Sequence, residues 1–170
     1  MQRLAGLAVI SLLVLGACGD DGVGPGRQAA AVFALRPVVD ESPPPCPEKA
    51  TGKDLRIAAE RKDGKVAACL TLGPAIVDAS DVRSAALGDL PENGGKAVSI
   101  VLGRTGATNL DSFAARRLGK RLAILANDRF VRAPVVQSPS FAGRIEVVGL
   151  PDDDAARFFE KLRKYQNASS

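Results

Sequence analysis

The fold class follows from residues 119–136, which read GKRLAILANDRFVRAPVV. Leu122–Ala126 is a continuous apolar run, which predicts a strand at the centre of a sheet. Asn127 and Asp128 accept the left-handed backbone of a tight turn, so the chain is expected to reverse there. A second strand is then expected over Phe130–Val136. This segment therefore predicts antiparallel pairing at the centre of the fold.

The residues upstream predict a second antiparallel pair. Asp63 and Gly64 separate Asp54–Lys62 from Lys65–Leu72, and an Asp-Gly pair between two strands is typical of a two-residue hairpin turn. Apolar runs predict further strands at Ala31–Val39, Ala97–Leu102 and Arg144–Val148. One or two helical turns are expected at Ser80–Ala86.

Two longer helices are predicted. Ala107–Leu118 has apolar residues at helical spacing and ends before Gly119, a glycine in the usual C-terminal position. Asp152 is expected to cap a helix that continues to about Tyr165. Strands in runs with two good helices predict an α+β fold, with a mainly antiparallel sheet and the two main helices packed on one face.

Composition excludes several kinds of catalytic site. The 170 residues include no His, which rules out a Ser-His-Asp triad, a His-activated cysteine and a His-ligated zinc. Three Cys are too few for a four-thiolate zinc site. We therefore predict no catalytic residue, no metal ligand and no cofactor. The net charge of +4 does not demand a nucleic-acid partner, and none is expected.

The N-terminus has the pattern of a lipoprotein signal peptide. A positive start is followed by the apolar run Leu4–Leu15. A transmembrane helix is the first alternative, but this run is shorter than the about 20 residues that a membrane span needs, so it indicates a cleavable signal. Leu15–Cys18 reads LGAC and resembles the bacterial lipobox. The resemblance implies cleavage before Cys18 and lipid on its thiol; an ordinary secreted protein is the second alternative. The expected location is the extracytoplasmic face of the cell membrane, anchored by lipid.

Four segments are predicted along the chain. They are a signal peptide at 1–17, a flexible tether at 18–30, a single domain at 31–165 and a frayed tail at 166–170. The tether prediction depends on Gly19–Gly26, which is rich in glycine. No later stretch approaches the length of a membrane span.

Two cysteines are left once Cys18 carries lipid. Outside the cytoplasm Cys46 and Cys69 are expected to form a disulfide, and the alternative is a pair of buried free thiols. The disulfide would attach the proline-rich loop Glu41–Pro47 to the strand at Lys65–Leu72. Closing a loop of about 24 residues contributes roughly 3.5 kcal/mol in the chain-entropy model.

Three further features are candidates for binding. Asp152–Asp154 could bind calcium, but contiguous acids at a helix start fit capping and dipole stabilisation better. A set of cations could form a patch toward anionic lipid or nucleic acid, although solvated faces explain them as well. These cations are Arg116, Arg117, Lys120, Arg121, Arg129 and Arg132. Phe141 lies in a loop between prolines and glycines, and it is the one candidate for an exposed apolar binding contact.

Several segments follow the order seen in one known family. They are GKRLAILANDRFVRAPVVQSP (119–139), GRIEVVG (143–149), the acidic helix containing Ala155–Arg157, and upstream Leu72–Pro74, Asp81, Val82 and Ala85. Together they resemble the SecD/SecDF protein-export family, in the head subdomain of its first periplasmic (extracytoplasmic) region. The resemblance covers about Leu70–Lys164. It implies an α+β head that lies outside the membrane beside the translocation channel and contacts emerging polypeptide.

The chain also departs from that family. The family's turn usually carries Asp-Gly where this chain has Asn127 and Asp128, and ion-coupled pulling by transmembrane helices is not carried over. The favoured function is a non-catalytic module that binds unfolded or emerging polypeptide or components of the Sec translocon. The alternative is an envelope-structural or small-ligand-binding lipoprotein that reuses the scaffold. An exposed sheet edge beside an apolar groove would favour the first function, and a closed polar pocket the second.

Overall fold

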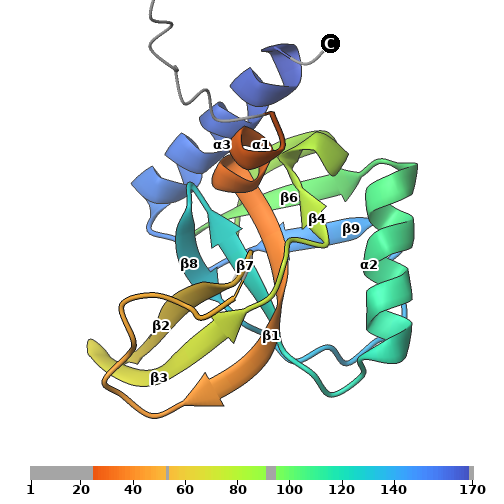
Figure 1. The fold of residues 1–170 in the computed structure, drawn as a ribbon. Helices are drawn as coiled ribbons and strands as arrows, with labels where there is room; N and C mark the ends of the chain where they lie inside the picture. Colours follow the sequence, from red (N-terminus) through yellow and green to blue (C-terminus); the bar gives the residue numbers. More distant parts are fainter. Residues whose placement is uncertain (1–24, 53, 91–94, 169–170) are drawn as a thin grey trace, which may run out of the picture.

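The computed structural model describes residues 25–52, 54–90 and 95–168. Figure 1 shows an α+β fold in which antiparallel strands form two sheets. The strands are β1 (Phe33–Ser42), β2 (Arg56–Lys62), β3 (Lys65–Leu72), β4 (Val77–Asp78), β5 (Val82–Asp89), β6 (Lys96–Leu102), β7 (Leu122–Ala126), β8 (Arg129–Arg132) and β9 (Arg144–Val147). The helices are α1 (Pro25–Val32), α2 (Arg104–Arg116) and α3 (Asp152–Ala168), with a 3-10 turn η1 (Ala79–Asp81).

The larger sheet has the strand order β2-β3-β1-β7-β8, with β4 beside β1, and the smaller one has the order β5-β6-β9. Every residue of β7 is buried, as its apolar run predicts. Asn127 and Asp128 have φ values of 52° and 60°, so the predicted turn into β8 is confirmed. Asp63 and Gly64 likewise form the predicted hairpin turn, with φ values of 51° and 76°.

The main core lies between the two sheets and the helices. Alternate residues of β1 and β7 point into it, among them Leu35 and Ile124, which are directly paired. Leu110 of α2 and Phe158 of α3 enter the same core, and the Phe158 ring lies 6.1 Å from that of Phe33. The predicted α+β class with two main helices, α2 and α3, is therefore confirmed.

The opposite face of the larger sheet closes on itself. Its core consists largely of small side chains, which allow a sheet to curl tightly. They are Ala34, Ala58, Ala68, Ala123 and Ala133, together with Leu70, Leu72 and Leu125. Strand β2 lies against β8, and Arg121 is paired with Glu60 of β2 and Glu41 of β1. Both outer edges of the larger sheet are thus brought together.

Three predicted boundaries are wrong near the N-terminus and in the middle of the chain. Residues 25–30 belong to α1 rather than to a flexible tether, and Ala29 is fully buried. The first strand therefore begins at Phe33. Only Ala79–Asp81 is helical in the region predicted as helical turns, because Val82–Asp89 pairs with β6 as a strand. Asp78 caps that short turn by accepting from the Ser80 N–H.

Both long helices differ from prediction at their ends. Helix α2 begins at Arg104 and ends at Arg116, so Leu118 lies beyond it and is 52% exposed. Helix α3 extends to Ala168, which places part of the predicted frayed tail in regular structure. Asp152 is the first residue of α3, and its carboxylate accepts from the Lys96 N–H at 3.0 Å. Asp152 therefore lies in the first turn of α3 and also links this helix to the first residue of β6.

Candidate polypeptide-binding site

In the smaller sheet, the outer strands β5 and β9 each have an edge with no strand beside it. In the β6–β9 pair, the Leu102 N–H donates to the Gly143 carbonyl at 2.8 Å. Because hydrogen-bonded pairs alternate along antiparallel strands, the backbone of Arg144 and Glu146 points away from β6. The Arg144 N–H already donates a hydrogen bond to the Phe141 carbonyl at 3.0 Å. The backbone of Glu146 and the Arg144 carbonyl therefore remain directed outward.

An apolar pocket of about 260 Å³ adjoins β9. Its walls come from α2, β1, β7, β9 and the segment that connects β8 to β9. It is lined by Leu35, Leu110, Leu122, Ile124, Pro134, Val135, Val136, Gln137, Ser138, Phe141 and Ile145. These side chains carry no ionisable group, so the pocket favours an apolar guest. Ile145 connects the pocket to the β9 edge, because it belongs to both.

Asp111 of α2 holds the loop over this pocket. Its carboxylate accepts from the Phe141 N–H at 2.8 Å and from the Ser140 hydroxyl at 3.0 Å. The chain then passes through Ala142 and Gly143, with φ values of 51° and 67°, into β9. Sequence patterns did not identify Asp111, because its partners lie some thirty positions away. The loop is therefore positioned by a charge-assisted contact that is visible only in the fold.

Phe141 occupies a different environment from the exposed contact that was expected. It is half-buried, packs against the main core and lines the apolar pocket. Its side chain is therefore part of a wall that a bound apolar group would touch, rather than a projection into solvent.

The predicted basic patch is divided between different surfaces. Arg121 is paired with Glu41 and Glu60, and the latter interaction raises the pKa of its guanidinium. Arg129 lies 3.5 Å from Asp154 across the start of α3. Arg132 is exposed on β8. The remaining three members, Arg116, Arg117 and Lys120, border one open groove beside α2.

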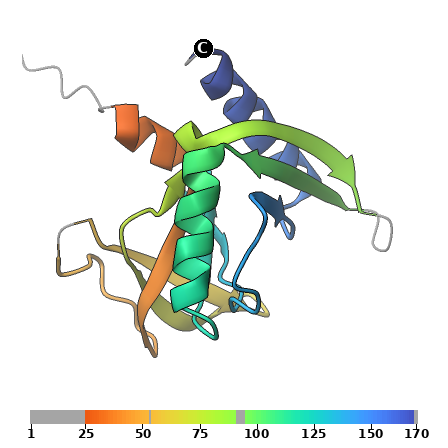
Figure 2. The same ribbon diagram turned by 90° about the vertical axis from the view of Figure 1, so that its right-hand side faces the viewer.

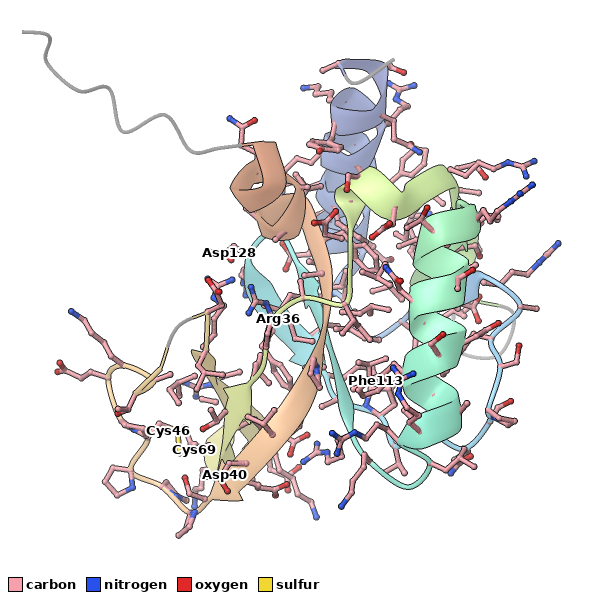
Figure 3. The ribbon with its side chains drawn as sticks, turned by 45° about the vertical axis from the view of Figure 1, so that its right-hand side comes forward. Arg36, Asp40, Cys46, Cys69, Phe113 and Asp128 are labelled. Carbon is pink, nitrogen blue, oxygen red and sulfur yellow. A yellow bond between two sulfur atoms is a disulfide. The ribbon has the colours of Figure 1, made fainter. Side chains whose placement is uncertain are left out.

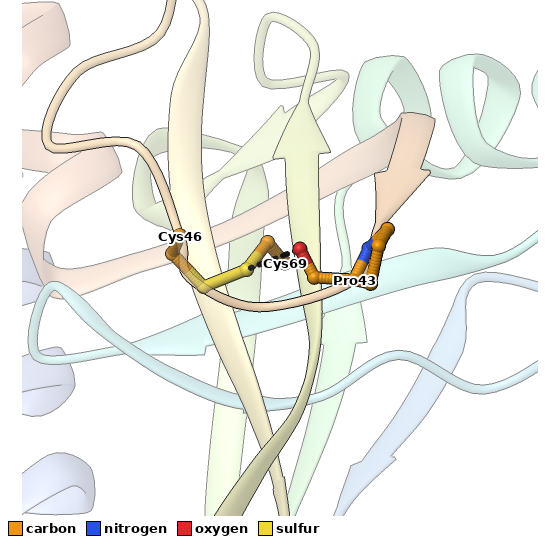
Figure 4. The surroundings of a disulfide bond; sticks show 3 residues. All are labelled: Pro43, Cys46 and Cys69. Carbon is orange, nitrogen blue, oxygen red and sulfur yellow. Dashed lines mark hydrogen bonds between the residues drawn. A yellow bond between two sulfur atoms is a disulfide. The ribbon is translucent and has the colours of Figure 1, made fainter.

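Cys46 and Cys69 form a disulfide, with their Cα atoms 5.2 Å apart (Figure 4). It attaches the proline-rich loop after β1 to β3, as the sequence predicts. The Cys69 sulfur also lies 3.8 Å from the Pro43 carbonyl oxygen. This is a contact and not a hydrogen bond, since a disulfide sulfur carries no proton.

The other predicted sites have different outcomes. Cys18 lies outside the described residues. Asp154 is paired with Arg157 at 2.6 Å, and this contact, which is on the surface, lowers the pKa of Asp154. Within residues 25–52, 54–90 and 95–168, no three His, Cys, Asp or Glu side chains are grouped as a metal site would require. No helix in these ranges is both long and apolar enough to cross a bilayer.

Two solved structures of SecDF are similar to this chain. One, described as a membrane component that enhances protein export, is 28% identical with a TM-score of 0.50, over 54% of this chain and 42% of that one. SecDF in a super-membrane-facing form has a TM-score of 0.55 at 23% identity, over 81% of this chain and 19% of that one. The chain thus spans less than half the length of either SecDF chain. No curated protein matches it.

The family model described as SecDF, P1 head subdomain, matches residues 54–162. The match begins upstream of the expected Leu70 and includes the β2–β3 hairpin, so the resemblance extends over more of the fold than the sequence patterns indicated. Because the matched segment is more than half of the chain, this protein belongs to the SecDF P1 head subdomain family.

Proposed function

We propose that this protein is a non-catalytic module that binds extended polypeptide during protein export, held by a lipid on Cys18 at the extracytoplasmic face of the membrane. The likeness to SecDF, a membrane component that enhances protein export, supports the link to export. The lipobox-like Leu15–Cys18 motif supports the anchor.

The observation that carries the proposal is the apolar pocket beside the open edge of β9. An extended peptide would pair its backbone with the outward-facing groups of Arg144 and Glu146 and place an apolar side chain beside Phe141. Backbone pairing does not read sequence, which suits a module that accepts many exported chains. The short β9 edge limits pairing to a few hydrogen bonds, so affinities around micromolar or weaker are expected.

The test is a titration of a labelled, reduced, unfolded protein and of its folded form against the mature chain carrying Cys18→Ser. Only the unfolded form should bind. Phe141→Ala should weaken that binding roughly three- to tenfold, because it removes one wall of the pocket. Phe159→Ala is the matched control, since Phe159 is also half-buried against the main core but lies on α3, outside the pocket.

Circular dichroism at the titration temperature shows that both variants remain folded. Equal binding of the folded and unfolded proteins, or no binding at high concentration, would reject this function. It would then favour the envelope-structural or small-ligand role for the same scaffold.

A further inference from the structure

A second groove, of about 510 Å³, lies between the C-terminal halves of α2 and β1. Its apolar lining, which we call the floor, is made by Pro37, Val39 and Phe113, whereas Val38 lines the groove but packs its side chain against the alanine-rich core. Its rim is cationic and is made by Arg116, Arg117 and Lys120. We call it the α2–β1 groove. It is distinct from the pocket beside β9, with which it shares no lining residue.

Gly73 packs closely against the β1 residues that form the floor of the α2–β1 groove. The Gly73 N–H donates to the Pro37 carbonyl at 2.8 Å, and a Cβ atom at Gly73 would lie 2.9 Å from the Pro37 ring. Gly73 therefore allows the backbones to approach closely under Pro37 and Val39. Val39 is nevertheless 56% exposed.

Two exposed apolar side chains belong to the segments that border this groove, since Val39 lines it and Leu118 lies between Arg117 and Lys120 in the chain. Val135, the third large apolar side chain that is exposed among the described residues, lines the pocket beside β9. Hydrogen bonds join their segments, from the Gly119 N–H to the Val136 carbonyl and from the Val38 N–H to the Arg121 carbonyl. Grouped exposure of this kind is typical of a surface that binds a partner.

The rim is positively charged and not neutralised by neighbouring acids. In the described part of the chain, the ion pairs include none of Arg116, Arg117 and Lys120. Glu41, the acid on β1 close to this end, is paired with Arg121. Asp40 does not line the groove, and it is labelled close to Cys69 of the disulfide in Figure 3. The groove therefore complements a partner that carries both carboxylates and apolar groups.

The position of the groove favours a polypeptide over a membrane surface. In both Figure 1 and Figure 2, the C-terminal ends of α2 and β1 lie at the end of the molecule opposite α1. Pro25, the first residue that the structure describes, begins α1. If the proposed anchor at Cys18 holds the molecule by its α1 end, the α2–β1 groove lies at the end away from the bilayer.

We propose that the α2–β1 groove binds acidic segments of extended polypeptide, with apolar side chains on its floor and carboxylates at its cationic rim. This inference rests on the proposed polypeptide binding but assigns it a second surface and a charge preference. Clients with acidic residues next to apolar ones would then be held at two places, the β9 edge and the groove.

The test uses two fluorescent peptides that share one apolar sequence, one with interspersed Glu and one with Gln in its place. Both are titrated against the mature chain carrying Cys18→Ser. The groove variant combines Arg116→Gln, Arg117→Gln and Lys120→Gln. The charge-matched control combines Lys62→Gln, Lys65→Gln and Lys161→Gln, which alters three exposed lysines elsewhere.

The groove variant should weaken binding of the Glu peptide roughly fivefold or more and leave the Gln peptide unchanged. The control should change neither. Equal losses in both variants would show attraction by overall charge only and overturn the proposal, as would unchanged binding in both. Loss of binding to anionic phospholipid vesicles without loss of the Glu peptide would also overturn it and assign the groove to lipid. If the Gln peptide does not bind at all, the proposed function at β9 fails while the groove is still tested by the Glu peptide.

Discussion

Arg56 and Asp128 lie 72 positions apart in the chain, and their side chains form an ion pair that joins the start of β2 to the turn between β7 and β8. Arg121 and Glu60 make a second pair, beyond the other end of β7. The small side chain of Ala58 lies between Arg56 and Glu60 on β2 and enters the alanine-rich core. The two pairs thus hold β2 across the curled sheet at both ends.

Removing the Asp128 carboxylate should weaken the fold slightly at neutral pH and make it less sensitive to acid. The hydrogen bond from Arg56 lowers the pKa of Asp128 from 3.8. The ion pair therefore contributes to folding stability at pH values above the pKa of Asp128 in the unfolded chain. This contribution is lost as the pH falls through the lower pKa of Asp128 in the folded protein. Because both side chains are more than one-third exposed, Asp128→Asn should cost less than about 1 kcal/mol.

Urea unfolding of both proteins at pH 7 and pH 3 measures this effect. Burial raises the pKa of Asp81, so the titration of Asp81 changes the stability with pH in the opposite direction. Because Asp81 is present in both proteins, the quantity to compare is the difference between their free energies of unfolding. A difference in unfolding free energy that is as large at pH 3 as at pH 7 would contradict a stabilising role for the Arg56–Asp128 ion pair.

Arg36 should be a stabilising contact in spite of its buried charge. It is 9% exposed and donates to the carbonyls of Gly73 at 2.8 Å and Asp54 at 3.0 Å. Burial, and then the charge of Arg56, lower its pKa. Arg36→Met should cost about 1–3 kcal/mol, because it leaves these carbonyls without their donor. Thermal unfolding measures the loss, with exposed Arg132→Met as control; equal stability of the two variants would refute the role.

Gly106 should not tolerate a side chain. A Cβ atom there would lie 2.6 Å from the Cβ of Asp81, where α2 packs on the short turn η1. Gly106→Ala should cost about 1–3 kcal/mol, although the better helix propensity of Ala offsets part of this loss. Gly88→Ala is the control, since no atom lies within 4 Å of its added Cβ. Chemical denaturation of both variants decides the question, and a Gly106→Ala protein as stable as the parent would contradict the packing.

Reducing the Cys46–Cys69 bond should lower the melting temperature. The chain-entropy model gives roughly 3.5 kcal/mol for this loop, equivalent to roughly 7–14 °C in a domain of this size. The mature chain with Cys18→Ser should show no free thiol before reduction. Two thiols that titrate in the native, unreduced protein would disprove the bond.

Cys18→Ser should release the protein from membranes. The lipobox-like motif makes Cys18 the expected lipid attachment site, and a single substitution removes the acceptor thiol. Fractionation of cells that express the native or the substituted chain, without detergent, measures the difference. If both partition alike, the anchor does not depend on Cys18.

Patterns in single segments predicted the centre of the fold well. The apolar run of β7 and the two turns with positive φ are local signals, and both appear where expected. Strand β5 was missed because Val82–Asp89 is rich in small residues, and its pairing with β6 is what makes it a strand. Helix α1 was missed because Pro25 and Gly26 suggested a linker, although Pro is also favoured in the first turn of a helix.

The candidate site was harder to predict than the fold. Phe141 was identified by its place in a loop, but its pocket is formed by residues from five separate segments. The contacts of Asp111 with Ser140 and Phe141 and of Arg121 with Glu60 join distant parts of the chain. No periodicity records such pairs, since they depend on which faces the folded sheet and helices bring together.

The pairing of β1 with β7 has a consequence for when the protein can fold. Phe33 pairs with Ala126, so one edge of β1 can be paired only after β7, which comes late in the chain, has been made. Contacts that are this distant in sequence give a high contact order and slow folding. A chain that emerges from a ribosome or a channel N-terminus first can therefore pair β1 with β3 and β4 early, but the edge of β1 from Phe33 to Pro37 lacks its β7 partner until Leu122–Ala126 has followed. Completion of the large sheet is thus a late event that follows the emergence of β7.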